Sequence, residues 1–130
     1  MGRSSGLRAL EAAQLLASEI LSAVELFPSP DPAGLRRQLS EAANSVAANI
    51  AEEMGRGTRG EKLHFLRMAR GSLEETQSHL KVCRSAEYID TKRFLRLWNL
   101  SVVLGRMLSA LIAKIEREQP SPRRKKARRR

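Results

Sequence analysis

Cysteine and aromatic residues are scarce in this sequence, and each scarcity excludes a class of protein. Cys83 is the only cysteine among 130 residues, so no disulfide can form within the chain, which favours a reducing cytoplasm. Only five residues are Phe, Trp or Tyr. Sheet proteins rely on aromatic and β-branched side chains, whereas this chain is rich in Leu and Ala, which favour helices. The composition therefore predicts an all-α, cytoplasmic protein.

Long apolar runs are missing as well. No uninterrupted run approaches the ~20 residues that a transmembrane helix needs, and residues 1–6 lack the apolar segment of a secretory signal peptide. We therefore expect no membrane partner. The length suits one domain with one hydrophobic core.

Apolar residues recur with the 3.6-residue period of a helix in four segments, at about residues 5–27, 33–54, 58–86 and 90–118. Thr58, followed three residues later by Glu61, opens the third segment as a capping box, and Asp90 or Thr91 caps the fourth. The positions expected to face inward are Leu16, Ile20, Val24 and Phe27; Leu35, Leu39, Ala42, Val46, Ile50 and Met54; Leu66, Ala69, Leu73, Thr76, Leu80 and Cys83; and Leu97, Leu100, Leu104, Leu108, Leu111 and Ile115. Short connectors favour antiparallel neighbours, so residues 1–119 are predicted to form an antiparallel up-down-up-down four-helix bundle.

Positive charge is concentrated at the C-terminal end. The formal net charge is +10, of which residues 120–130 carry +7 without a single acid. These seven cations repel one another and have almost nothing apolar to bury, so residues 120–130 are expected to be a disordered basic tail. The cations are Arg123, Arg124, Lys125, Lys126, Arg128, Arg129 and Arg130.

Several blocks of the sequence resemble a known family. They are Phe27-Pro28, Leu35-Arg-Arg-Gln-Leu39, Ala43-Asn-Ser-Val-Ala-Ala-Asn-Ile-Ala-Glu52, Phe65-Leu-Arg-Met-Ala-Arg-Gly-Ser-Leu-Glu-Glu75 and Met107-Leu-Ser-Ala-Leu-Ile112. The chain is similar in these blocks to the bacterial four helix bundle protein family, first described as proteins encoded in intervening sequences of 23S rRNA genes. The accessory protein of diversity-generating retroelements is a relative.

The resemblance implies a ring-shaped homopentamer with a basic surface and no enzyme activity or cofactor. It implies nucleic-acid binding in the retroelement branch and an undefined role elsewhere. One position departs from the pattern: Glu53 stands where the family usually has Gly directly after Asn-Ile-Ala-Glu. The second helix is therefore expected to run up to a turn further.

The segment Gly55-Arg-Gly57-Thr-Arg-Gly60 matches the dinucleotide motif G-x-G-x-x-G. That motif works only between a strand and a helix, and here a helix precedes it. The segment is instead expected to be a helix–helix turn with a positive φ. An intermediate interpretation also stays open, in which Arg56 and Arg59 hold a phosphate at the start of the third helix, with Glu61 competing for that position.

Metal and catalytic sites find little support. Glu61-x-x-His64 is half of a di-iron carboxylate motif, but the only other histidine, His79, has Thr76 three residues before it. The two histidines are about 22 Å apart on one helix, so one ion cannot reach both. No nucleophile has a convincing partner, and we expect neither a metal site nor catalysis.

Three features admit both a structural and a functional interpretation. Lys92, Arg93 and Arg96 begin the fourth helix, where cations oppose the helix dipole; they form either a solvated face or a surface that a partner requires. A polar strip on the second helix consists of Asn44, Ser45, Asn49 and Glu52. We interpret it as a hydrogen-bond network or a subunit contact in preference to a binding edge. Gly71, in mid-helix, is expected to allow the close approach of a neighbouring helix.

Leu95, Trp98 and Val102 lie beside the core stripe of the fourth helix at spacings of three and four. A lone bundle need not bury them, and a partner copy would, so they are the predicted oligomer interface. The alternative is that Trp98 caps the core of the monomer. The pentameric count comes only from the family resemblance.

The favoured function is a non-catalytic, homo-oligomeric scaffold that binds RNA or DNA through its basic surface and tail. Base-stacking aromatics are scarce, so little sequence readout is expected. The alternative is a protein adaptor that docks a larger enzyme, such as a reverse transcriptase. A nucleotide-using enzyme is a remote third hypothesis, which rests on the glycine turn alone.

Overall fold

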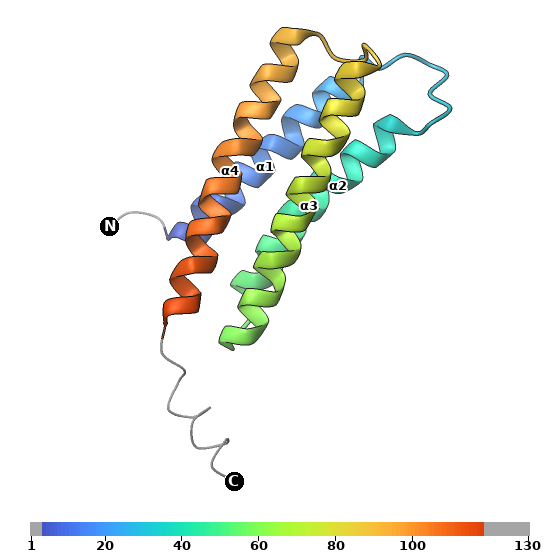
Figure 1. The fold of residues 1–130 in the computed structure, drawn as a ribbon. Helices are drawn as coiled ribbons and strands as arrows, with labels where there is room; N and C mark the ends of the chain where they lie inside the picture. The colour runs from blue at the N-terminus through green and yellow to red at the C-terminus, as the bar shows by residue number, and fades with distance from the viewer. Residues whose placement is uncertain (1–3, 119–130) are drawn as a thin grey trace.

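The computed structural model describes residues 4–118, and this range contains four helices and no strand. The helices are α1 (Ser5–Val24), α2 (Leu35–Met54), α3 (Arg59–Ser85) and α4 (Thr91–Arg117). Helix α1 packs on α2 and α4, and α3 packs on the same two helices, so α1 and α3 are diagonal to each other (Figure 1). Consecutive helices run antiparallel, with α1 and α2 behind α3 and α4 in Figure 1. The all-α, four-helix architecture agrees with the prediction.

The ends of the helices follow local capping chemistry. The hydroxyl of Thr58 accepts a hydrogen bond from the backbone N–H of Glu61, and the carboxylate of Asp90 accepts one from that of Arg93, so both predicted N-caps are confirmed. Helix α1 ends at Val24, three residues earlier than expected, because the chain tightens there. The N–H of Phe27 bonds to the carbonyl of Val24, three residues back.

The proline-containing connector, residues 25–34, is held against the loop between α3 and α4. The buried ring of Phe27 meets Tyr88 edge-on, with 5.1 Å between the centroids. Asp31 accepts from the backbone N–H groups of Leu35 (3.1 Å) and Arg36 (3.0 Å) and from the hydroxyl of Tyr88 (3.4 Å). These donors hold the pKa of Asp31 below its ordinary value, with the N–H of Arg36 the largest cause. Asp31 thus caps α2, whose N-cap residue is a glycine.

The core runs along the axis of the bundle and consists of the predicted inward positions, with exceptions at the ends of α2 and at Leu100 on α4. Most of those positions are buried, whereas Leu35 and Leu100 are half-buried. Met54 is 41% exposed, so its predicted inward position is wrong. Glu53 turns inward in its place and is only 5% exposed, because Lys62 on α3 forms an ion pair with it at 3.0 Å. Helix α2 ends at Met54, so the further turn expected from Glu53 is absent.

Two glycines differ from expectation in their surroundings. A Cβ atom on Gly71 would have nothing within 4 Å, so the predicted close approach of a neighbouring helix at this position is wrong. At Gly105 on α4 a Cβ atom would lie 3.5 Å from the Leu73 side chain, which is an ordinary van der Waals contact. Gly71 is on the exposed side of α3, one residue away from the α2–α3 contact at Ser72.

Helix α4 is long and apolar enough to cross a membrane, judged by length and composition alone. The search for an unbroken apolar run missed this, because polar residues such as Asn99 and Ser101 interrupt a window whose mean hydropathy is 1.3. In the bundle 33% of that window is buried. Core helices of bundles commonly pass the same test, since one apolar face is enough to raise the mean hydropathy. Two large apolar side chains of α4 remain exposed, Leu95 at 50% and Val103 at 47%.

Candidate functional site

Arg59, one of the two arginines predicted to hold a phosphate, is the first residue of α3. Its Nε donates to the carbonyl oxygen of Ile115 (3.0 Å), and its Nη2 donates to that of Glu116 (2.7 Å). The last carbonyls of a helix have no intrahelical donor, so Arg59 caps the C-terminal end of α4. The guanidinium therefore ties the start of α3 to the end of α4.

Arg56, the second of these arginines, lies in the turn between α2 and α3 and is surrounded by groups of its own chain. Its guanidinium forms ion pairs with Glu52 (2.8 Å) and Glu61 (3.7 Å) and lies over the ring of Phe65, 5.0 Å from the centroid. The carboxylate of Glu61 also accepts a hydrogen bond from the hydroxyl of Thr58 (2.7 Å), so an acid already occupies the start of α3. A phosphate would have to displace these acids to reach Arg56.

The glycines of this turn do not adopt the predicted conformation. Gly55 ends α2 with φ −90°, and Gly34 is the only glycine with positive φ between residues 4 and 118. The expected positive φ in the turn is therefore wrong. Gly55 has right-handed geometry, and Thr58, with extended backbone, is the N-cap of α3.

The other predicted nucleic-acid ligands lie outside the described residues. They are Arg123, Arg124, Lys125, Lys126, Arg128, Arg129 and Arg130. The described chain ends at Glu118, one residue after α4. The residues around the end of α4 show which cations of the bundle lie near the point where the tail begins.

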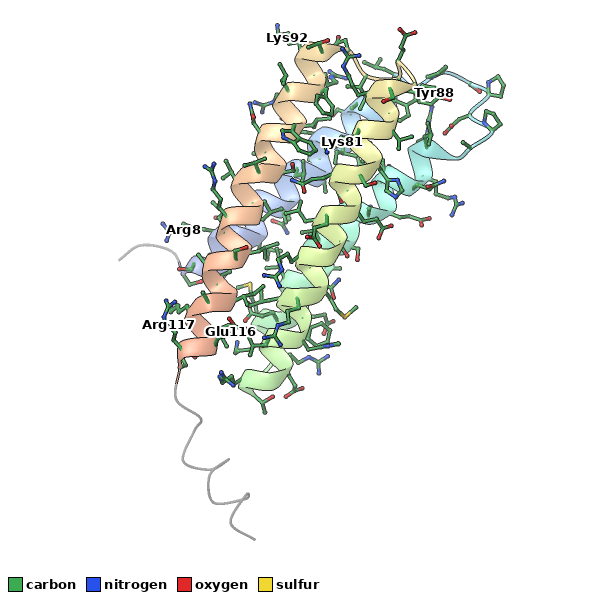
Figure 2. The ribbon with its side chains drawn as sticks, in the orientation of Figure 1. Arg8, Lys81, Tyr88, Lys92, Glu116 and Arg117 are labelled. Carbon is green, nitrogen blue, oxygen red and sulfur yellow. The ribbon has the colours of Figure 1, made fainter. Side chains whose placement is uncertain are left out.

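A hollow of about 410 Å³ lies between the start of α1 and the end of α4, and we call it the tail-end hollow. Arg8, Lys114 and Arg117 surround it, together with Ser5, over an apolar floor of Met107, Ala110 and Leu111. Figure 2 shows Arg8 and Arg117 on the same flank of the molecule. No acid lines this hollow, and within residues 4–118 none of its three cations forms an ion pair.

The predicted interface residues lie on one exposed side of α4, and we call them the outer α4 face: Leu95, Trp98 and Val102. Leu95 is 50% exposed, and the other two are half-buried. The ring of Trp98 stacks on Phe94, with centroids 5.7 Å apart, and Lys81 Nζ lies 5.1 Å from the ring centroid. Trp98 therefore packs partly within its own bundle, whereas Leu95 does not.

At the opposite end of the molecule a larger hollow, of about 680 Å³, opens between the end of α1 and the start of α4. We call it the connector-end hollow, because residues 25 and 26 begin the connector there. Arg96 holds Glu19 across it through two hydrogen bonds of 2.8 Å. The Arg96 hydrogen bond lowers the pKa of Glu19, and Glu19 in turn raises the pKa of Arg96. Figure 2 shows Lys92 and Tyr88 at this end, far from Arg117 and Glu116.

The polar strip of α2 divides into a half-buried part, Ser45 and Asn49, and an exposed part, Asn44 and Glu52. The hydroxyls of Ser45 and Ser72 are 2.9 Å apart across the α2–α3 contact, and Asn49 donates to the carbonyl (2.9 Å) and the hydroxyl (3.2 Å) of Ser45. Asn44 is exposed, and Glu52 pairs with Arg56. The strip is thus partly a hydrogen-bond network between helices, which is the interpretation favoured from the sequence.

The side chains that could take part in catalysis or metal binding are isolated from one another. Cys83 is fully buried, and desolvation raises the pKa of its thiol to about 11, with Asp31 a lesser cause. The ring of His64 meets that of Phe65 edge-on, with 5.0 Å between the centroids, whereas His79 Nε2 lies 3.5 Å from the Glu75 carboxylate. Among the described residues no three His, Cys, Asp or Glu side chains converge.

A model of the 23S rRNA-intervening sequence proteins matches residues 5–110 of this chain. The chain belongs to the 23S rRNA-intervening sequence protein family. The match spans α1 to α3 and most of α4. It includes every block that carried the resemblance, except for the last two residues of the final block, 111 and 112. No curated protein matches the chain.

The fold of this 23S rRNA-intervening sequence protein is shared with a solved structure. A crystal structure of a protein of unknown function from the S23 ribosomal protein family of Bacteroides thetaiotaomicron is similar with a TM-score of 0.76 and 18% sequence identity. The similarity covers 85% of this chain and 99% of that chain. At this identity the comparison shows the fold alone.

The grouping of Arg8 with Lys114 and Arg117 was not predicted from the sequence. Arg8 and Lys114 are 106 positions apart in this 23S rRNA-intervening sequence protein, and only the packing of α1 on α4 brings them to one hollow. The available signal was the position of Arg8 in the first turns of α1, where a cation opposes the helix dipole.

Proposed function

We propose that this protein is a non-catalytic, homo-oligomeric scaffold that binds nucleic acid at the tail end of its bundle. The observation that carries the proposal is the tail-end hollow, where Arg8, Lys114 and Arg117 gather without an acid. Lys114 and Arg117 also complement the negative end of the α4 dipole, but Arg8 opposes the dipole of its own helix, so helix stability does not explain its position.

The position of the hollow adds to this argument. Arg117 is the last residue of α4, and seven further cations follow it in residues 120–130. Phosphates that the tail attracts would reach the hollow next, and each neutralised phosphate releases counterions, which is the main source of nonspecific affinity. Neither Arg56 nor Arg59 has to leave its intramolecular partners in this arrangement.

Salt titration tests the proposal. Affinity for a labelled single-stranded RNA, measured by fluorescence anisotropy, should fall with salt with a log–log slope of up to about −5 from the seven tail charges alone. Deleting residues 120–130 should flatten the slope and weaken binding to all sequences alike. In the full chain, the double substitution Arg8→Glu and Lys114→Glu should weaken binding relative to the unsubstituted full chain. It should also reduce the magnitude of the log–log salt slope by at least about 1.

A matched control changes the same net charge elsewhere. Arg37 is exposed at the start of α2 and Arg106 is exposed in the middle of α4, and neither lines the tail-end hollow. Arg37→Glu with Arg106→Glu should reduce affinity much less than the pair in the hollow. Equal losses would mean that net charge alone sets the affinity, and an unchanged slope after tail deletion would remove the tail from the mechanism.

The oligomeric part of the proposal rests on the outer α4 face and on the apolar surface that α4 keeps outside the core. A closed ring needs one face of each subunit to meet a different face of the next, and it would gather the tails, so weak contacts would gain from effective concentration. Five subunits are the family-based expectation. Light scattering coupled to gel filtration should give a multiple of 14.5 kDa, with five as the expected factor; a single 14.5 kDa species would exclude the scaffold in this form.

A further inference from the structure

The connector-end hollow is larger than the tail-end hollow, and the nucleic-acid scaffold gives it no role. It is about 680 Å³ in volume, which is within the range of small-ligand and peptide sites. Its apolar wall is formed by Ala23 and Ile89, which are buried, and by Leu26, which is 71% exposed. No other large apolar side chain in residues 4–118 is as exposed as Leu26.

Cations stand beside this wall at an unfavourable position. Lys92 and Arg93 lie in the first turn of α4, where the positive end of the helix dipole opposes them. Neither forms an ion pair within residues 4–118, in contrast to Arg96, which is held by Glu19. The hollow therefore has three cations, Lys92, Arg93 and Arg96, against two acids, and its net positive charge lies next to an exposed leucine. A carboxylate with an apolar neighbour would complement this combination.

Acids in the same hollow argue against a nucleic acid as the occupant. Glu19 and Asp90 both line it, and both would repel a continuous chain of phosphates. Glu19 is held ionised by Arg96, whose hydrogen bonds lower the pKa of Glu19. The tail-end hollow, by comparison, has no acid. A peptide has separate charges, so it can place one carboxylate at Lys92 and Arg93 and keep its other groups away from Glu19.

We infer that the connector-end hollow is a docking site for a peptide segment of a partner protein in which an acidic residue is followed by a large aliphatic residue. The aliphatic side chain packs against Leu26 and Ile89, and the carboxylate pairs with Lys92 and Arg93. The site lies at the end of the bundle away from the tail, so one copy can hold a protein partner and a nucleic acid at the same time (Figure 2).

Methyl NMR on the full chain tests this directly. The probe is a five-residue peptide, blocked at both ends, with one aspartate followed by two leucines between serines. It should shift the methyl signals of Ala23, Leu26 and Ile89, with a dissociation constant on the order of 0.1–1 mM for so short a ligand. The same peptide with asparagine for aspartate, or with serines for the leucines, should bind at least fivefold more weakly.

Substitutions separate the two parts of the site. Leu26→Ala and Arg93→Glu should each weaken the aspartate peptide at least fivefold, and Arg93→Glu should prefer a peptide with lysine for aspartate. The controls are Leu21→Ala, an exposed leucine of α1 outside the hollow, and Arg106→Glu on α4; both should stay within twofold of the unsubstituted chain. All four substituted residues are exposed, so the variants should keep their helical circular dichroism.

Three results would overturn the inference. Equal binding of the asparagine peptide would show simple apolar adhesion. Shifts of the same methyl groups by a single-stranded RNA, in the protein without residues 120–130, would assign the hollow to nucleic acid. Shifts that depend only on protein concentration, without peptide, would show that a second copy fills it.

Discussion

The guanidinium of Arg59 donates a 3.0 Å hydrogen bond to the carbonyl oxygen of Ile115, fifty-six residues further along the chain. The bond fixes the end of α4, from which the basic tail continues. Arg59→Ala should lower the free energy of unfolding by about 1–2 kcal/mol, because two carbonyls at the helix end lose a charged donor.

Urea unfolding measures this change, and Arg67→Ala is the matched control. Arg67 also reaches the end of α4, but it forms an exposed ion pair with the Glu116 side chain, so its removal should cost about 0.5 kcal/mol or less. If Arg59→Ala instead left stability unchanged and weakened RNA binding, the sequence-based prediction of a phosphate ligand would be right.

Asp31 should make the stability of the bundle depend on pH. Its folded-state pKa lies below the ordinary value of 3.8, so its contribution is complete above that value and is lost as the pH falls through the lowered pKa. Asp31→Asn should therefore destabilise the protein at neutral pH, and the difference from the unsubstituted chain should shrink steadily below pH 4.

Thermal unfolding at a series of pH values gives this profile. Tyr88→Phe is the control, because it removes only the 3.4 Å hydrogen bond and keeps both backbone donors. Its effect should be smaller than that of Asp31→Asn. A pH-independent difference for Asp31→Asn would show that shape, and not charge, sets the contribution of this residue.

Gly71 and Gly34 should respond in opposite directions to alanine. A Cβ atom on Gly71 meets nothing within 4 Å, so Gly71→Ala should stabilise α3 by up to about 1 kcal/mol through helix propensity. Gly34 has φ +68°, so Gly34→Ala should destabilise by about 1 kcal/mol. Urea unfolding compares the two. A destabilising Gly71→Ala would indicate that another copy approaches α3 at this position.

Trp98→Asp should break the proposed oligomer and leave most of the helical circular dichroism intact, because a charge would enter the outer α4 face. Val103→Asp is the control: Val103 is 47% exposed and lies on the other flank of α4, about 140° from Trp98 around the helix. Light scattering should show dissociation only for Trp98→Asp. Loss of the fold in that variant would instead place Trp98 in the core of the monomer.

The errors in the sequence analysis share a physical origin. Met54 fits the apolar period of α2, yet Glu53 takes the inward position, because Lys62 supplies a charge partner from the next helix. Gly71 looks like a packing glycine, but a rotation of one residue puts Ser72 at the contact. A periodic pattern gives the direction of a face, whereas its exact centre depends on which side chains of the neighbouring helix fill it.

The four helices, their caps at Thr58 and Asp90, most of the core and the family could be predicted from the residues alone, because they depend on local hydrogen bonds, on the 3.6-residue period and on residue identity. Which cations remain available could be seen only in the folded bundle. Arg59 is used on the carbonyls of α4, whereas Arg8 joins Lys114 at the tail-end hollow. The reason is that charge pairing acts between side chains that are distant in sequence, so the availability of a cation is set by packing.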